Sequence, residues 1–319
     1  MTRGAPPWPL ALLTGFLGSG KTTLVRALLG RAGMQDTLII VNEFGEVGID
    51  HHLIEAVHGD VVLLRGGCLC CSVRQDLART LRDLHLRWHA GDVPPFARVV
   101  VEASGLADPG AVVTTLLGHP LVCDAYALRS VTTLVDAEHA GAQLARHETS
   151  RRQVAAADRI LLTKPDRASP AVQAALRERL AAINGIAGIE TCRFGDADPA
   201  PLFAPEHMPR PRLSALRSDH GDDITSLVLT ADRPLAWPAV QRFLAGLLEA
   251  AGERLLRLKG VLDLAGEPRP VVVQAVHHSF YPLEMLPAWR PGRRESTLVL
   301  IAQGILPPRI KDDFAACAA

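Results

Sequence analysis

Lysine is scarce in this chain of 319 residues, although basic residues as a whole are not. Four lysines occur, and arginine supplies the other thirty of the 34 basic residues. Two of the four, Lys21 and Lys164, lie in motifs described below, where a compact ammonium fits and a planar guanidinium does not. The chain keeps lysine where a particular chemistry needs it.

The chain also lacks an excess of charge of either sign. Acidic and basic residues number 34 each, so the formal net charge is zero and the pI is near 7.2. Proteins with nucleic acid or an anionic membrane surface as a standing partner usually carry a basic excess. We therefore expect no nucleic acid and no membrane among the partners of this protein.

Long apolar runs and a spread of cysteines are missing as well. No uninterrupted apolar stretch is long enough to span a bilayer. The first twenty residues faintly imitate an export signal, but prolines interrupt them and their apolar run is needed as a strand. Six cysteines, three of them within four positions, suit a metal or redox site in a reducing compartment better than a disulfide framework. We expect a cytoplasmic protein.

A glycine-rich segment stands between an apolar run at residues 10–13 and a helical pattern. It reads GFLGSGKT and has the spacing GxxxxGK[ST] of a phosphate-binding P-loop. Backbone amides in such a loop point at one anion, and the start of the helix adds the positive end of its dipole. Lys21 would reach the β- and γ-phosphates of a nucleotide, and Thr22 would hold Mg²⁺. The predicted phosphate-binding residues are Gly15, Gly18, Ser19, Gly20, Lys21, Thr22 and Thr23.

An acidic loop, NEFGEVGID at residues 42–50, follows a predicted strand at residues 37–41. It lies where a GTPase keeps its first switch segment, between the P-loop helix and the next nucleotide motif. Its carboxylates, Glu43 among them, can contact a metal ion directly or through water. A solvated acidic loop without a ligand is the alternative.

Three thiols share one loop after the next predicted strand, at residues 61–64: Cys68, Cys70 and Cys71. Thiolates are soft ligands that suit Zn²⁺, Cu⁺ or other late first-row metals. Adjacent cysteines point in different directions, so this loop rarely closes a tetrahedral shell alone, and Glu43 and nearby histidines are candidates for the remaining position. An open shell suits a metal that is handed on. A redox-active thiol pair and buried inert cysteines are the alternatives.

A strand at residues 97–101 delivers an acid and a glycine to the same predicted site. Glu102 can hold Mg²⁺ through water, and the amide of Gly105 can sense a γ-phosphate. Because glutamate replaces the usual aspartate here, water mediation is more plausible than direct coordination. We assign catalytic roles to Lys21, Thr22, Glu102 and Gly105.

The strand at residues 159–162 runs into the tetrapeptide TKPD. A strand that ends in [NT]KxD is the guanine reader of P-loop GTPases. The Asp166 carboxylate would accept hydrogen bonds from N1 and N2 of guanine, which adenine does not offer. The stem of Lys164 would pack along the ring, and Thr163 replaces the commoner asparagine. These three residues are the predicted base-binding set.

Two domains separated by a linker follow from the composition. Residues 1–205 form the predicted P-loop domain, an α/β fold with a mostly parallel sheet flanked by helices. Residues 206–223 are rich in proline and charge and form the predicted linker. Residues 224–319 form a small α+β domain without a visible catalytic constellation.

The motifs GFLGSGKTT, NEFGEVGID, GGCLCC, EASGLADP and TKPD, in this order, resemble the CobW-type metallochaperone GTPases. The closing half, with LLRLKGVLDLAGE and QAVHH, resembles the C-terminal domain of that family. The resemblance implies hydrolysis of GTP coupled to delivery of a transition metal, Zn²⁺ or Co²⁺, to a client metalloprotein. It also implies that Cys68, Cys70 and Cys71 hold the metal. The metal, the client and the oligomeric state stay open, with a homodimer among the assemblies allowed.

We hypothesise that GTP–Mg²⁺ orders the acidic loop and tightens the thiolate site, and that hydrolysis loosens both. Two rival functions remain. A P-loop kinase of a small metabolite predicts a preference for adenine, against which TKPD argues. A thiol redox sensor predicts a response to oxidation of Cys70 or Cys71 instead of metal.

Overall fold

The structure is a computed structural model that describes residues 7–31, 33–41, 73–204, 224–289, 294–304 and 309–318. The chain divides into two compact units. The first comprises Met1–Arg177 and Ala187–His207, and the second Glu178–Ile186 and Met208–Ala319. Among the described residues, no helix has both the length and the apolar character needed to cross a membrane.

The first unit is built on a six-stranded sheet with the order β2-β3-β1-β4-β5-β6, in which every pairing is parallel. The strands are β1 (Trp8–Thr14), β2 (Thr37–Val41), β3 (Arg98–Glu102), β4 (Tyr126–Asp136), β5 (Arg159–Thr163) and β6 (Gly188–Cys192). Strands β2 and β5 are buried along their whole length, as expected for a parallel sheet covered on both faces. Because the strands are parallel, their carboxyl ends share one edge of the sheet.

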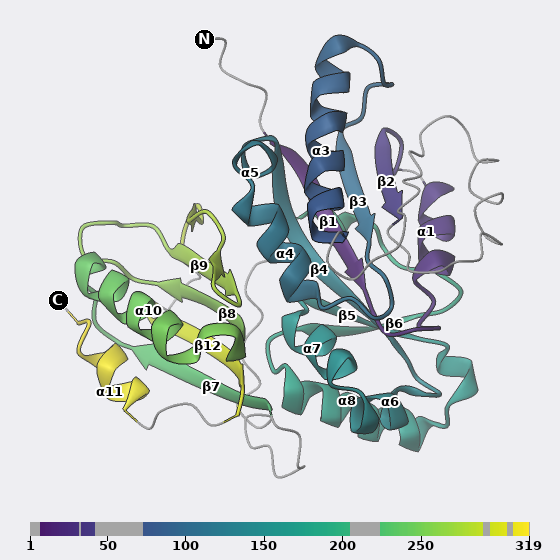
Figure 1. Ribbon diagram of the computed structural model, residues 1–319. Helices are drawn as coiled ribbons and strands as arrows, with labels where there is room; N and C mark the ends of the chain where they lie inside the picture. Colours follow the sequence, from purple (N-terminus) through teal and green to yellow (C-terminus); the bar gives the residue numbers. More distant parts are fainter. Residues whose placement is uncertain are drawn as a thin grey trace. The chain divides into compact units, whose positions relative to one another are not determined.

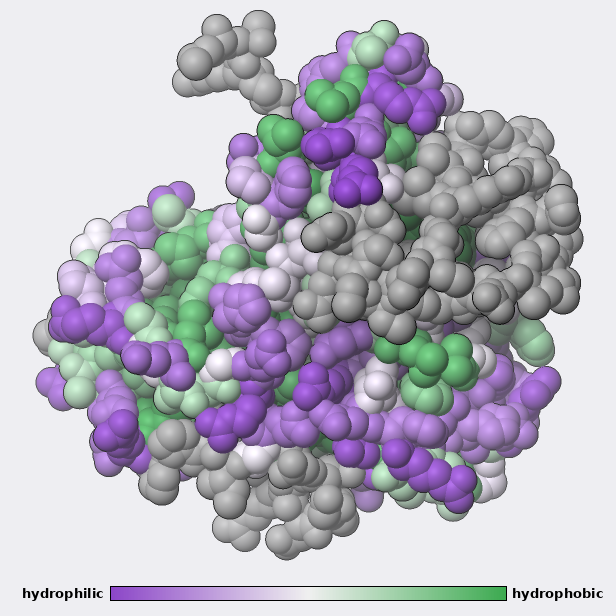
Figure 2. Space-filling view, viewed as in Figure 1, coloured by the Kyte–Doolittle hydropathy of each residue, from purple (hydrophilic) through white to green (hydrophobic). Residues whose placement is uncertain are grey.

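Helices flank this sheet (Figure 1). They are α1 (Lys21–Leu29), α3 (Val73–Ala90), α4 (Pro109–Gly118), α5 (Pro120–Ala125), α6 (Ala140–Arg146), α7 (Glu148–Ala156), α8 (Pro170–Ile183) and α9 (Ala200–Phe203), with a 3-10 turn η1 (Pro165–Arg167). Helix α1 buries Leu24, Val25 and Leu28 in a cluster with residues of β1 and β2. The surfaces of α3, α6 and α8 that face the viewer in Figure 2 are mainly hydrophilic, whereas Leu77, Leu81 and Leu84 of α3 are buried, as expected for an amphipathic helix.

The second unit holds a sheet with the order β10-β9-β8-β12-β7, with β11 paired to β9, and these strands pair antiparallel. Its elements are β7 (Ile224–Ala231), α10 (Trp237–Ala251), a 3-10 turn η3 (Gly252–Arg254), β8 (Leu255–Leu262), β9 (Val271–Val276), β10 (Ser279–Phe280), β11 (Glu284–Met285), β12 (Ser296–Gln303) and α11 (Ile310–Ala315). Leu244 and Leu247 of α10 pack with Leu258 and Leu298 of the sheet, and Phe314 of α11 completes this core. Figure 1 shows α10 lying across the sheet.

The predicted fold class is confirmed: a P-loop α/β sheet flanked by helices precedes a smaller domain with an antiparallel sheet. The predicted strand at residues 61–64 lies outside the described residues. Helices α4 and α7 were not predicted. The run AVVTTLL in α4 is apolar and β-branched, a composition that does not separate a helix from a strand by periodicity alone.

Candidate functional site

The P-loop leaves β1 and closes on the first turn of α1. Gly15, Gly18 and Gly20 all have positive φ, at 142°, 74° and 93°. A Cβ on Gly15 would lie 2.4 Å from the Leu134 carbonyl oxygen and 2.7 Å from Ser19 Oγ, so both space and φ require glycine there. Ser19 is 1% exposed and its hydroxyl lies inside the loop. This is the conformation that a phosphate cradle needs.

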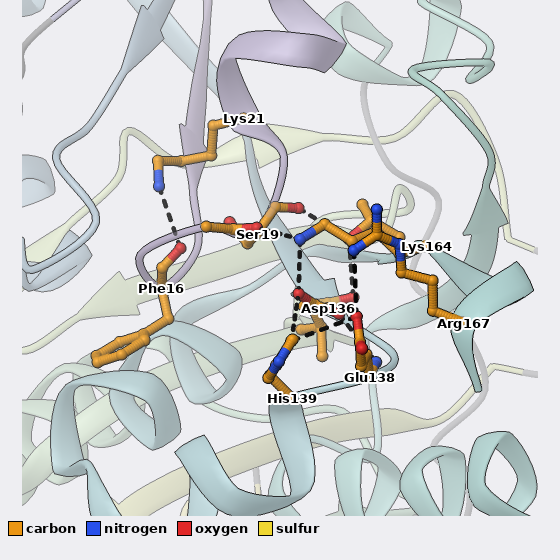
Figure 3. A network of polar contacts seen from close by, with 11 residues as sticks. Phe16, Ser19, Lys21, Asp136, Glu138, His139, Lys164 and Arg167 are labelled. Carbon is orange, nitrogen blue, oxygen red and sulfur yellow. Dashed lines mark hydrogen bonds and ion pairs between the residues drawn. The ribbon is translucent and has the colours of Figure 1, made fainter.

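Lys21 folds back over the loop. Its side chain is buried, and Nζ donates hydrogen bonds to the carbonyl oxygens of Gly15 (2.7 Å) and Phe16 (3.3 Å) (Figure 3). The ammonium is therefore held against the backbone of the P-loop, beside the predicted phosphate site. Thr23 lies one residue beyond Thr22 in the same first turn, where its side chain is exposed.

Thr22 and Glu102 meet although 80 residues separate them in the sequence. The Thr22 hydroxyl donates a hydrogen bond of 2.9 Å to Glu102 Oε1, and Glu102 is 5% exposed. The parallel register places Leu13 of β1 opposite Glu102, the last residue of β3. A hydroxyl and a carboxylate at one point form an all-oxygen donor pair, which fits Mg²⁺. The side chains predicted for that ion are thus brought together.

Gly105 lies directly against the P-loop. A Cβ on Gly105 would come within 2.6 Å of Leu17 Cδ2, 2.9 Å of Leu17 N and 3.0 Å of Leu17 Cα. Any larger residue would push the Gly105 loop (residues 103–108) away from the P-loop backbone. The loop is also tied to β1, because the Ala103 amide donates to the Leu13 carbonyl oxygen at 2.8 Å.

The base-reading segment is tied to the same P-loop. Thr163 Oγ1 donates to the Ser19 carbonyl oxygen at 2.8 Å, and Lys164 Nζ donates to that of Gly18 at 2.8 Å. Lys164 has a φ of 50°, which is unusual for a side-chain-bearing residue and turns the chain into η1. Asp166 is exposed, and its carboxylate has no hydrogen-bond partner among the described residues.

Asp136, the last residue of β4, supports this segment and was missed from the sequence. Its carboxylate is 2% exposed and accepts a hydrogen bond of 2.8 Å from Lys164 Nζ (Figure 3). Burial opposes ionisation of this carboxyl, but hydrogen bonds from Lys164 and the Glu138 amide, and the contact with His139, hold the pKa of Asp136 below its ordinary value. The signal was present, because Asp136 ends a buried strand as Glu102 does.

Asp136, Glu138 and His139 lie close enough together to share a metal ion. Lys164 Nζ, however, already lies 2.8 Å from Asp136 Oδ2, and Arg167 Nη1 lies 3.4 Å from Glu138 Oε2. These cations neutralise the carboxylates that a metal would need. We therefore interpret this cluster as support for Lys164.

Two glutamines hold the loops that flank the P-loop, and no sequence signal pointed to them. The Gln153 amide on α7 donates to the carbonyl oxygens of Gly105 and Ala107. The Gln173 amide on α8 donates to those of Pro165 and Ala168.

The predicted transition-metal ligands Glu43, Cys68, Cys70 and Cys71 lie outside the described residues, so their assignment stays a prediction. Helix α3 begins at Val73, two residues after Cys71. Of the cysteines that the structure describes, Cys192 and Cys317 are buried, and burial raises the pKa of both thiols. Both are therefore poor nucleophiles and poor metal ligands.

Two protein-family models together match nearly the whole chain. The CobW/HypB/UreG nucleotide-binding domain matches residues 9–190, and the cobalamin synthesis protein cobW C-terminal domain matches residues 224–318. The chain is 37% identical to the zinc chaperone YjiA of Escherichia coli K12, over 97% of this chain and 98% of that protein. It is 31% identical to the zinc chaperone CobW of Pseudomonas aeruginosa, over 85% and 81% of the two chains.

A solved structure supports the same assignment. The crystal structure of Zn(II)-bound YjiA GTPase from E. coli matches with a TM-score of 0.75 and 32% identity, over 99% of this chain and 100% of that chain. Both family models, the sequence identity and the fold agree with the order of motifs read from the sequence. This chain belongs to the CobW/HypB/UreG nucleotide-binding domain family and carries the family's cobW C-terminal domain.

Proposed function

We propose that this protein binds and hydrolyses GTP and uses the nucleotide cycle to load a transition metal, Zn²⁺ foremost and Co²⁺ as the alternative, and to deliver it to a client metalloprotein. The relatives named zinc chaperone YjiA and zinc chaperone CobW support the cargo. A relative from Schizosaccharomyces pombe named zinc-regulated GTPase metalloprotein activator 1 supports the kind of client.

The observation that carries the nucleotide part is the joining of two motifs that lie far apart in sequence. Thr163 and Lys164 donate hydrogen bonds to backbone carbonyls of the P-loop, at Ser19 and Gly18. A phosphate site and a base reader are thereby held as one site, with the Asp166 carboxylate left exposed. A guanine base seated there would satisfy that carboxylate with its N1 and N2 hydrogens.

The chain's own groups then have distinct tasks on GTP. The Lys21 ammonium would leave the carbonyls of Gly15 and Phe16 for the phosphates, where its charge is better compensated. Thr22 and Glu102 would hold Mg²⁺, which supplies charge neutralisation at the phosphates when bound. Gly105 would donate its amide to the γ-phosphate and so distinguish GTP from GDP. We expect slow hydrolysis that a partner accelerates, because the sequence offers no evident catalytic base.

The proposal that the protein carries a metal rests on the three cysteines of one loop and on the parallel sheet, whose strands all end at the edge where the nucleotide would bind. We propose that Cys68, Cys70 and Cys71, with Glu43 as a further ligand, bind the cargo, and that the nucleotide state sets their affinity. A client metalloprotein would receive the ion after hydrolysis. We also propose that residues 1–205 and 224–319 form the two domains. The protein would be cytoplasmic, with a homodimer as a possible assembly.

A nucleotide panel and a metal titration test the proposal. The purified protein should bind GTP and GDP at least tenfold more tightly than ATP and ADP, because only guanine offers two hydrogens to Asp166. It should bind Zn²⁺ through its thiols, and Cys70→Ser should weaken that binding. A preference for adenine would instead favour a kinase, and thiols that respond to oxidation but bind no Zn²⁺ would favour a redox sensor.

A further inference from the structure

Gln153 of helix α7 donates a hydrogen bond to the carbonyl oxygen of Gly105, the predicted γ-phosphate sensor. We propose that Gln153 is a positioning residue: by holding the Gly105 loop against the P-loop, it sets the preference of the site for GTP over GDP. The inference rests on the proposed function, since Gly105 can sense a γ-phosphate only if the protein binds GTP.

The amide of Gln153 is committed to this loop. Its Nε2 donates to the carbonyl oxygens of Gly105 and Ala107, both at 3.1 Å, and the residue is 1% exposed. Both partners are acceptors, so the side chain must turn its NH₂ group toward them. Its Oε1 is buried without a hydrogen-bond partner among the described residues. Such a buried acceptor costs free energy, and the two hydrogen bonds to the loop offset that cost.

Gly105 is thereby confined from two sides. The Gln153 amide holds its carbonyl group, and the backbone of Leu17 lies close enough that a Cβ on Gly105 would meet Leu17 N at 2.9 Å. A glycine without such restraints rotates freely about φ and ψ. With its carbonyl held and Leu17 packed against its Cα, Gly105 keeps its position beside the P-loop, and its amide would stay within reach of a bound γ-phosphate. A donor already directed at the γ-phosphate pays no ordering cost when GTP binds.

The support behind Gln153 is itself fixed. The Gln153 carbonyl oxygen accepts a hydrogen bond of 2.8 Å from Thr133 Oγ1 on β4. Its neighbour Arg152 forms an ion pair of 3.0 Å with Asp108 at the far end of the Gly105 loop. The loop is thus held by α7 at its middle and at its far end, and α7 is held by the central sheet.

Gln173 provides a matched control, because the same chemistry acts on the other side of the site. Its Nε2 donates to the carbonyl oxygens of Pro165 and Ala168 at 2.9 and 3.0 Å. Those residues flank Asp166, which would contact the base. The base is common to GTP and GDP, so this glutamine should not distinguish the two nucleotides.

The test compares Gln153→Met and Gln173→Met, which keep side-chain length and remove the donor. Affinities for GDP and for the non-hydrolysable analogue GMPPNP are measured with Mg²⁺ for the wild type and both variants. Q153M should weaken GMPPNP about tenfold, the effect expected from two lost hydrogen bonds, and leave GDP within about twofold. Q173M should weaken both nucleotides by one common factor. Retained GDP affinity of Q153M also reports an intact fold.

Several outcomes would overturn the proposal. Q153M could leave the ratio of GMPPNP to GDP affinity unchanged, or Q173M could shift that ratio as much as Q153M does. If Q153M does not fold, Gln153→Asn replaces it, because this variant keeps the amide but is one methylene too short to reach both carbonyl oxygens. A ratio unchanged in Q153N then overturns the inference. A wild-type protein that binds neither GMPPNP nor GDP overturns the proposed function itself.

Discussion

The base side and the γ-phosphate side of this site are held by interactions of different strength. On the base side, the Lys164 ammonium bridges the buried Asp136 carboxylate and the Gly18 carbonyl oxygen. On the γ-phosphate side, the Gly105 loop is held by the neutral amide of Gln153, by contact with Leu17 and by the partly exposed Arg152–Asp108 ion pair. Hydrogen bonds to charged groups are about twice as strong as neutral ones. The base reader is therefore held by a buried charged network, and the Gly105 carbonyl by neutral hydrogen bonds.

The largest expected effect is on the base side. Asp166→Asn should lower the affinity for GTP and GDP by about a hundredfold or more, because two hydrogen bonds from the base to a charged acceptor are lost. Titration with fluorescent guanine nucleotides measures this. The same variant should gain affinity for xanthine nucleotides, whose base presents an acceptor where guanine presents its amino group. Guanine affinity close to that of the wild type would show that Asp166 does not read the base.

Gly105→Ala disturbs the γ-phosphate side of the site. The added methyl would overlap Leu17 and push the loop away from the P-loop, so affinity for GMPPNP should fall about thirtyfold, with GDP little changed. Competition binding with the two nucleotides gives the ratio. Equal losses for both nucleotides would place Gly105 among the residues that bind the β-phosphate or only maintain the fold.

Asp136→Asn tests whether the buried carboxylate that contacts Lys164 supports binding of the base. Removing the charge that faces Lys164 should weaken GTP and GDP alike, by about tenfold, because the lysine loses its charged acceptor. Isothermal titration measures both nucleotides. A loss confined to GTP would mean that Asp136 acts on the γ-phosphate side.

The smallest effect concerns acid stability. The pKa of Asp136 is lowered in the folded protein from an ordinary value of 3.8, so its carboxylate stabilises the fold at pH above that value. The contribution is lost as the pH falls through the folded pKa. Urea unfolding should therefore show a wild-type advantage over D136N of about 1 kcal/mol at pH 7 that shrinks below about pH 4. An advantage that persists at pH 2 would contradict the assignment.

Short, chemically specific motifs could be predicted from the sequence, but the side chains that hold those motifs in place could not. Gly15, Lys21, Thr22 and Glu102 could be predicted because phosphate and Mg²⁺ binding demand these residue types at these places. Gln153 was not identified, because a glutamine in a helix has no sequence signature that tells which carbonyls it meets. Its contacts depend on where α7 lands on the sheet, which only the packed fold decides.

The expected roles of Glu43 and the three loop cysteines follow from their spacing and from the family resemblance. Both segments lie outside the described residues, so these roles stay predictions. Of the described cysteines, Cys192 and Cys317 are buried with raised pKa values, so the loop that carries Cys68, Cys70 and Cys71 is a better candidate for a thiolate site than either.

The central claim is that the nucleotide sets the grip of the thiolates on the metal. The direct measurement is the Zn²⁺ affinity of the wild-type protein, by competition with a chelator of known affinity, once with GMPPNP–Mg²⁺ bound and once with GDP–Mg²⁺ bound. We predict that Zn²⁺ binds at least tenfold more tightly in the GMPPNP state. Equal affinities in the two states would contradict the account.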